Sequence, residues 1–224
     1  MPLDTRLRDA LVAAIDAYDF PCVTYDFSLN VEREHHSMRS VEEEVRSCLL
    51  SDNIEIVKNG LSNVLYWGYS RIGYRDCRVS RFRKNVTTTQ LSEAQTLFTR
   101  LEGPGVIRIK KLGLPELSGL SFISKVRMFL DPSNYVALDL KLMTLLEEIQ
   151  QTIFQGTTLR PNATTIRVTR SAEKFYERWC DLCRRIAREN FDGTAIRVVD
   201  IERAIFYLVD TNQPELAAKI LTSA

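Results

Sequence analysis

Two residues near the middle of the chain, Lys125 and Asp139, have side chains suited to nucleophilic and electrostatic catalysis. An amine can attack an electrophilic carbon and form a Schiff base, and a fixed carboxylate can stabilise a developing cation and orient an attacking water. Ser121 lies four residues before Lys125 in a helical pattern, so both side chains share one helix face. Each candidate also has a structural alternative. Asp139 can be the N-cap of the helix that follows it, and Lys125 can be a partly buried lysine paired with a carboxylate or a phosphate.

A basic segment precedes these residues, with six cations and one Asp between Arg71 and Lys84. Aromatic residues lie before and within it, and such a combination suits a groove that follows phosphates and holds a displaced base. The predicted phosphate contacts are Arg71, Arg75, Arg81, Lys84, Lys110 and Lys111, and the predicted base pocket is Trp67, Tyr69, Tyr74, Ser121 and Ser124. Alternatives are a solvated helix face for the cations and a core position for the aromatic residues, above all for Trp67.

Cysteine and histidine give little support to metal or redox chemistry. The five Cys are dispersed, which fits reduced thiols, and the pair Cys180 and Cys183 shares one face of a helical pattern, where core packing is the favoured role. His35 and His36 are adjacent and cannot both point at one centre. We therefore expect no metal and no cofactor.

The composition is that of a globular protein. With 224 residues, 45% hydrophobic and 26% charged, and a net charge of +1, the chain excludes disordered, collagen-like and fibrous classes. No apolar run is long enough for a membrane span, and the first residues lack the order of a secretory signal, so a cytoplasmic location is expected.

Apolar periodicity predicts an all-α fold with at most one or two short strands. The expected helices cover residues 3–18, 41–50, 54–67, 91–101, 117–130, 138–154, 172–191, 201–209 and 215–221, and the expected strands cover residues 22–27 and 164–169. The breaks between them are too short for linkers. We expect one compact unit over residues 1–224, with a possible division into 1–156 and 157–224.

The segment from Leu112 to Leu142 resembles the helix-hairpin-helix superfamily of DNA glycosylases, and more narrowly the prokaryotic relatives of the 8-oxoguanine glycosylases. In that group a Ser-Lys pair precedes an aromatic-Leu-Asp-Pro turn and an Asp. The corresponding elements are Ser124-Lys125, then Phe129-Leu130-Asp131-Pro132, and Asp139. The turn Glu116-Leu-Ser-Gly-Leu-Ser121 has fewer glycines than the family's hairpin, which predicts fewer backbone amides close to a phosphate.

The resemblance implies an enzyme that flips a modified base out of duplex DNA and cleaves its N-glycosidic bond. Asp139 would be the essential carboxylate, and Lys125 would add a strand-cutting lyase step if it is the nucleophile. The implied substrate is an 8-oxoguanine-like lesion or a modified base of foreign or phage DNA, and the implied state is a monomer with DNA as its partner. The alternatives are a non-catalytic helical DNA-binding or adaptor module and an all-α protein-interaction domain.

Overall fold

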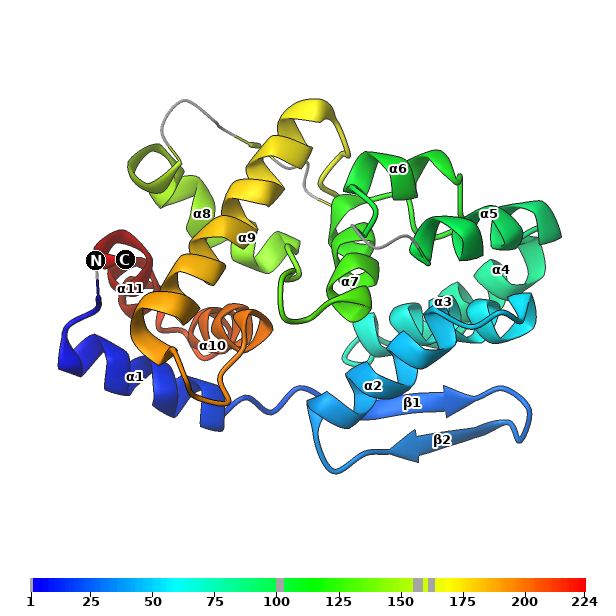
Figure 1. The fold of residues 1–224 in the computed structure, drawn as a ribbon, viewed down its shortest axis with the longest axis horizontal. Coiled ribbons are helices and arrows are strands. Elements are labelled where there is room, and N and C mark those ends of the chain that lie inside the picture. Colours follow the sequence, from blue (N-terminus) through cyan, green and yellow to red (C-terminus); the bar gives the residue numbers. More distant parts are fainter. Residues whose placement is uncertain (1, 100–102, 155–158, 161–163) are drawn as a thin grey trace. The chain divides into compact units, whose positions relative to one another are not determined.

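The computed structural model describes residues 2–99, 103–154, 159–160 and 164–224 (Figure 1). The described residues form an all-α protein with eleven helices and one two-stranded antiparallel sheet, which confirms the predicted fold class. The chain divides into two compact units. We call residues 20–131 the central unit and residues 1–19 with 132–224 the terminal unit.

The central unit begins with a β-hairpin and continues with six helices. In the hairpin, Val23 pairs with Glu34 and Asp26 pairs with Val31. The elements are β1 (Val23–Asp26), β2 (Val31–Glu34), α2 (Met38–Leu49), α3 (Ile54–Gly68), α4 (Arg75–Asn85), α5 (Thr88–Phe98), α6 (Val106–Lys111) and α7 (Leu120–Leu130).

Helix α3 forms the core of the central unit. Asn53 caps its N-terminus by accepting from the Glu55 amide, as expected for an Asn before an apolar-periodic run. Residues from Gly60 to Trp67 are buried almost without interruption. A Cβ atom at Gly60 would lie 2.9 Å from the Cβ of Cys48, so this glycine allows α2 to approach α3 closely.

The terminal unit joins the two ends of the chain. Its elements are α1 (Thr5–Asp16), α8 (Leu140–Ile153), α9 (Arg170–Phe191), α10 (Val198–Asp210) and α11 (Pro214–Ser223). Helix α1 packs on α10, almost 200 residues away in the sequence. This packing places α1 in the same unit as α10, so the units divide at 19/20 and 131/132, whereas one compact unit with a possible division after residue 156 was expected. Residues 155–158 themselves lie outside the described part of the chain.

Helix α9 supplies the centre of the terminal core. Phe175, Tyr176 and Trp179 are fully buried along one face of it. Cys180 and Cys183 are buried on the same helix, and burial raises the pKa of the Cys183 thiol well above its usual value. Both cysteines therefore contribute to packing, as the spacing favours. Within the described residues, no cluster of three or more Cys, His, Asp or Glu side chains could hold a metal ion.

Three elements escaped the sequence prediction, and one of the two strand-like segments, for which pairing and a merely extended course were both open, forms no strand. Helix α4 buries only Val79 and Phe82, too few apolar positions for a clear period, and α6 is only 6 residues long. Strand β2 is exposed at every position, so it has no alternating pattern. Residues 164–169 form none of the strands of the described chain. The end of the helix expected over 91–101 lies outside the described residues.

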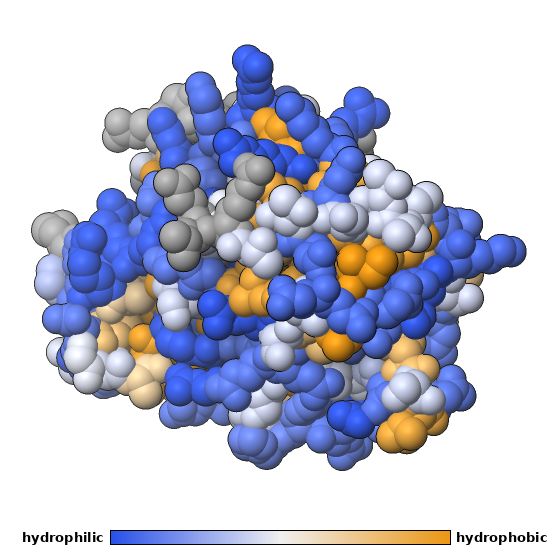
Figure 2. Space-filling model, turned by 45° about the vertical axis from the view of Figure 1, so that its right-hand side comes forward, coloured by the Kyte–Doolittle hydropathy of each residue, from blue (hydrophilic) through white to orange (hydrophobic). Residues whose placement is uncertain are grey.

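The surface of the described residues is predominantly polar. The face drawn in Figure 2 is mostly hydrophilic, with hydrophobic side chains in small groups between charged ones. The large apolar side chains with high exposure are Leu29, Val31, Ile56, Ile72 and Tyr74. No helix in the described ranges combines the length and apolar character that a membrane crossing needs.

Candidate functional site

The hairpin that positions Lys125 consists of α6, an eight-residue turn and α7. Leu114 and Leu117 bury their side chains beneath the turn, while Gly113 and Glu116 adopt positive φ angles of 64° and 62°. A positive φ is uncommon for a residue with a Cβ atom and is retained where the surroundings fix it. Gln90 of α5 donates to the Gly113 carbonyl oxygen at 2.7 Å and so contributes to that constraint.

Glu116 fastens this turn to helix α4. Its side chain is only 8% exposed and accepts from Nη1 of Arg78 at 2.6 Å and from Nη1 of Arg81 at 3.3 Å. The hydrogen bond to Glu116 raises the pKa of Arg78. One carboxylate therefore joins two arginines of the basic segment to the turn that begins α7.

Lys125 is buried within α7, with 7% of its surface exposed. Its Nζ atom donates to the Ser121 carbonyl oxygen at 3.4 Å and lies 5.4 Å from the centre of the Phe122 ring. Ser124 is fully buried and also donates to the Ser121 carbonyl, at 3.1 Å. The predicted proximity of Ser121 and Lys125 on one helix face is therefore observed.

The Phe122 ring next to this lysine begins a chain of three packed aromatic rings. The rings of Tyr69 and Phe122 have centres 4.4 Å apart, and those of Tyr69 and Tyr74 are 5.4 Å apart in an edge-to-face arrangement. Tyr74 is 49% exposed, whereas burial raises the pKa of Tyr69. We call Tyr69, Tyr74, Ser121, Phe122 and Lys125 the lysine–aromatic cluster, which extends from an exposed ring to a buried amine.

Gly68 makes room for the cluster at the end of α3. A Cβ atom there would lie 2.6 Å from Cε1 of Phe122 and 3.3 Å from Cδ of Lys125. No Cβ atom tolerates the shorter of these distances, so any other residue would move the phenylalanine ring. The sequence analysis singled out neither Gly68 nor Phe122, because close approach between helices leaves no mark in residue spacing.

Trp67 is separate from this cluster. It is 4% exposed, and its ring lies 4.8 Å from that of Phe20 and 5.2 Å from that of Phe129, measured between centres. These contacts are those of a core residue, the alternative that its sequence pattern already favoured. Trp67 therefore belongs to the core and offers no exposed face to a base.

Asp139 lies in the terminal unit and caps α8. Its Oδ1 atom accepts from the backbone amides of Lys141 at 3.0 Å and Leu142 at 3.2 Å. The structural role expected for an Asp at this position is therefore present. The side chain is half-buried, and the cap engages one carboxylate oxygen in these two bonds.

The Pro132 to Asp139 loop is held by donors from α9 and α10. Tyr176 Oη donates to the Val136 carbonyl and Trp179 Nε1 to the Ala137 carbonyl, both at 2.9 Å and both buried. The Val199 amide donates to the Pro132 carbonyl at 3.2 Å. These bonds fix the backbone that places Asp139, and they join segments too far apart along the chain for residue spacing to predict them.

Two of the predicted phosphate contacts are engaged inside the central unit. Arg75 pairs with Glu32 at 3.1 Å and lies 3.8 Å above the Tyr66 ring, and Arg81 pairs with Glu116. These carboxylates offset part of their charge. Arg71, Lys84, Lys110 and Lys111 are exposed, and the Arg71 guanidinium lies 4.9 Å from the centre of the Phe20 ring.

A cavity of about 480 Å³ lies between the β1–β2 hairpin and helices α3 and α4. Its lining includes Tyr25, Phe27, Tyr66, Arg75 and Arg83. Both arginines stack on rings, Arg83 at 4.0 Å from the centre of Phe27. Arg83, in α4, also donates to the side chains of Asn59 and Ser62 in α3. This arginine therefore links α4 both to α3 and to Phe27 of the turn between β1 and β2.

Comparisons with known proteins leave the family of this chain open. No protein-family model, curated protein or solved structure matches it. Arguments about function therefore rest on the residues and geometry described above.

Proposed function

We propose that this protein is a DNA glycosylase of the helix-hairpin-helix kind, which flips a modified base from duplex DNA and cleaves its N-glycosidic bond. The observation that carries the proposal is the lysine–aromatic cluster. It combines an amine and a hydroxyl-bearing face of α7, the second helix of a hairpin, with the packed rings of Phe122, Tyr69 and Tyr74. A flipped base needs a stacking surface and polar groups beside it, and these are the groups present.

Asp139 has the chemistry to stabilise the transition state. Bond cleavage builds positive charge on the deoxyribose, and a fixed carboxylate close to C1′ stabilises that charge and orients the attacking water. The cap and the hydrogen-bonded loop support this role because a carboxylate already held in place needs no reorganisation during the reaction.

Lys125 supplies either a nucleophile or a positive charge beside the substrate. As a nucleophile, its neutral amine would attack C1′ while the base leaves, giving a Schiff base from which the strand is cut by elimination. Its Nζ atom lies 5.4 Å from the centre of the Phe122 ring, next to the rings proposed to hold the flipped base. The proposed substrates are an 8-oxoguanine-like lesion and a modified base of foreign or phage DNA.

The test is base release by the wild type and two Asp139 variants. Asp139→Asn keeps a good N-cap but lacks the carboxylate charge, whereas Asp139→Ala loses both, at about 1 kcal/mol of stability. DNAs that carry damaged or phage-type bases are incubated with each protein, and freed bases are identified by mass spectrometry.

We expect release by the wild type, a loss of at least about a hundredfold in Asp139→Asn, and DNA affinity within about twofold of the wild type for that variant. If Asp139→Asn melts at the wild-type temperature but releases no base, then the carboxylate is needed for catalysis independently of its capping role. Equal release by the wild type and Asp139→Asn contradicts the assigned role of Asp139.

The second candidate is a non-catalytic helical DNA-binding or adaptor module. The observation in its favour is the N-cap, which accounts for Asp139 without any chemistry. Such a module binds DNA and releases no base from any of the substrates, so the same experiment decides between the two functions.

A further inference from the structure

The cavity between the β1–β2 hairpin and helices α3 and α4 is separate from the lysine–aromatic cluster, and we call it the hairpin cavity. Its volume of about 480 Å³ lies within the range typical of small-molecule sites. Helix α4 lines it with side chains of one helix face: Arg75, Asp76, Val79, Ser80 and Arg83. The proposed glycosylase chemistry makes no use of this cavity.

Arg83 is held at the hairpin cavity by contacts that use only part of its guanidinium group. Its Nη1 atom donates to Oδ1 of Asn59 at 2.8 Å and to Oγ of Ser62 at 3.1 Å. Ser62 is buried and donates to the Lys58 carbonyl at 2.7 Å, so this hydroxyl is itself fixed. The Cζ atom of Arg83 lies 4.0 Å from the centre of the Phe27 ring. The arginine is therefore oriented by the protein alone.

The other edge of this guanidinium group has no partner in the described part of the chain. The Nε and Nη2 atoms of an arginine carry parallel N–H groups, and this pair can donate two hydrogen bonds to one carboxylate or phosphate. Neither atom of Arg83 has an acceptor among the described residues, because its hydrogen bonds are the two made by Nη1. Arg83 thus keeps the edge that recognises anions open.

The charge of Arg83 also lacks an ion-pair partner among the described residues. Glu55 favours the charged form from a distance, but its mostly exposed carboxylate pairs with Lys58 at 3.6 Å. Burial lowers the pKa of Arg83, which reflects the cost of holding a half-buried charge. An arginine stays protonated at neutral pH, so an anion at its open edge would offset this cost.

Arg75 lies about 12 Å along α4 from Arg83 and is engaged differently. It pairs with Glu32 at 3.1 Å and with Asp76 at 3.2 Å, and it lies 3.8 Å from the centre of the Tyr66 ring. Carboxylates therefore offset the charge of Arg75. Of the two arginines that line the cavity, only Arg83 contributes a positive charge that no described carboxylate pairs with.

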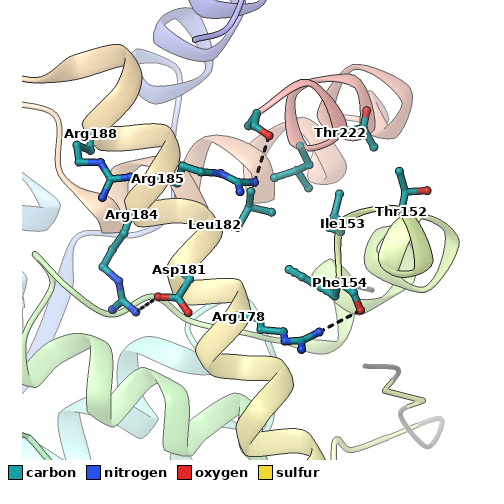
Figure 3. Close-up of a pocket in the computed structure, with 12 residues that line it drawn as sticks. Thr152, Ile153, Phe154, Arg178, Asp181, Leu182, Arg184, Arg185, Arg188 and Thr222 are labelled. Atoms are coloured by element: carbon teal, nitrogen blue, oxygen red, sulfur yellow. Dashed lines mark hydrogen bonds and ion pairs between the residues drawn. The ribbon is translucent and has the colours of Figure 1, made fainter. Parts of the chain in front are cut away.

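A larger cavity in the terminal unit shows the contrast (Figure 3). It has a volume of about 790 Å³, and the arginines that line it lie on two sides of α9. Arg184 pairs with Asp181 at 2.7 Å, and Arg178 donates to the Phe154 carbonyl at 3.3 Å. These arginines are engaged by a carboxylate and by a main-chain oxygen, whereas the Nε and Nη2 atoms of Arg83 are not.

Three aromatic side chains line the hairpin cavity and pack on one another. The ring of Tyr25 is tilted against those of Phe27 and Tyr66, with 5.1 Å between the centres in both pairs. Val79 adds an apolar side chain from α4. Aromatic rings prefer tilted or offset contacts with further rings, so these side chains suit an aromatic ligand.

We propose that the hairpin cavity binds a small aromatic carboxylate. The carboxylate accepts two hydrogen bonds from Nε and Nη2 of Arg83, and the ring lies against Tyr25, Phe27 and Val79. A phosphate monoester is a weaker match, because it carries about two negative charges at neutral pH and would approach Asp76. The inference is independent of the proposed function, since the cavity shares no residue with the lysine–aromatic cluster and does not include Asp139.

The test is an NMR titration of the full chain with phenylacetate and two probes of similar size. Phenylacetamide has a neutral amide in place of the carboxylate, and phenyl phosphate has a dianion. For a ligand of about ten heavy atoms we expect a Kd of about 1 mM for phenylacetate. Phenylacetamide should bind at least about tenfold more weakly, because it lacks the charged acceptor. This comparison uses the wild type and so needs no variant to fold.

Two variants and one control assign the binding to Arg83. Arg83→Lys keeps the charge but lacks the parallel donors, and Arg83→Gln removes the charge. We expect the affinity for phenylacetate to fall at least about threefold in the first and at least about tenfold in the second. The control Arg167→Gln changes an exposed arginine of the terminal unit and should bind within about twofold of the wild type. Thermal melting verifies that each variant is folded.

Each outcome decides the proposal. Nuclear Overhauser contacts between the phenylacetate ring and the Val79 methyl groups support the site, and contacts confined to residues elsewhere overturn it. Equal affinities for phenylacetate and phenylacetamide overturn it, as does unchanged affinity in a folded Arg83→Gln variant. Tighter binding of phenyl phosphate than of phenylacetate overturns the choice of a carboxylate. Base release from DNA is measured separately, so failure of this proposal leaves the glycosylase proposal standing.

Discussion

Two residues show how one side chain can have both a structural and a chemical role. Asp139 caps α8 through Oδ1, and the same bonds hold its carboxylate in a fixed orientation. Lys125 is buried with its amine close to one backbone carbonyl and one aromatic ring. A primary amine next to aromatic rings has the chemistry for attack on the sugar of a flipped nucleotide.

The role of Lys125 is testable with Lys125→Met, which keeps an unbranched apolar stem and removes the amine. With DNA that contains a substrate base, we expect sodium borohydride to trap a covalent adduct with the wild type and none with Lys125→Met. The reason is that borohydride reduces only a Schiff base formed by an amine. The control is Arg167→Gln, which changes an exposed arginine of the terminal unit and should give as much trapped adduct as the wild type.

Absence of an adduct with an active wild type refutes the nucleophile and leaves Lys125 as a charged or structural group. An adduct that persists in Lys125→Met assigns the attack to another amine.

At the scale of elements, the cluster depends on how closely α3 approaches α7. Gly68 permits the contact, and the Glu116 carboxylate holds the turn before α7 against α4. On the terminal unit, Tyr176 and Trp179 hold the loop before α8. Lys125 and Asp139 are therefore positioned by contacts with residues outside their own segments of the chain.

Gly68→Ala tests the first of these contacts. The added Cβ would force Phe122 and the stem of Lys125 to move, which we expect to lower stability by about 1 to 3 kcal/mol and base release by at least tenfold. Thermal melting and release rates measure the two effects.

Gly73→Ala is the matched control, because a Cβ atom at Gly73 meets nothing within 4 Å. Its melting and activity should match the wild type. If Gly68→Ala releases base at the wild-type rate, then the position of Phe122 and Lys125 has no bearing on the chemistry.

For the whole molecule, the net charge of +1 conceals an uneven distribution. Some cations of the central unit are paired with carboxylates, as Arg75 and Arg81 are with Glu32 and Glu116. Others are exposed, as are Lys84 and Lys111. Affinity for a polyanion comes from cations whose charge is not already offset, because only these release counterions from the nucleic acid.

The two kinds of cation can be compared directly. Lys84→Gln with Lys111→Gln should lower the salt slope of DNA binding by about 1.8, whereas Arg75→Gln with Arg81→Gln should change it by much less. The arginine variant should instead melt at a lower temperature, because it leaves Glu116 and Glu32 with fewer partners. Equal slopes for the lysine variant and the wild type remove both lysines from the interface.

The sequence by itself determined the all-α class and most of the helices, because helices such as α9 and α2 bury a periodic stripe that is visible in residue order. It also located Lys125 on the same helix face as Ser121 and Asp139 at a helix start, since both follow from local spacing. It missed α4, whose arginines and scarce apolar residues give no period, although α4 supplies the partners of Glu116.

Only the tertiary structure decided which groups surround these candidates. It brought Tyr69 and Tyr74 to Phe122 and Lys125, assigned Trp67 to the core, and joined α1 to α10 in one unit. Contacts between distant segments depend on packing and close approach, and neither is encoded in the spacing of residues along one helix.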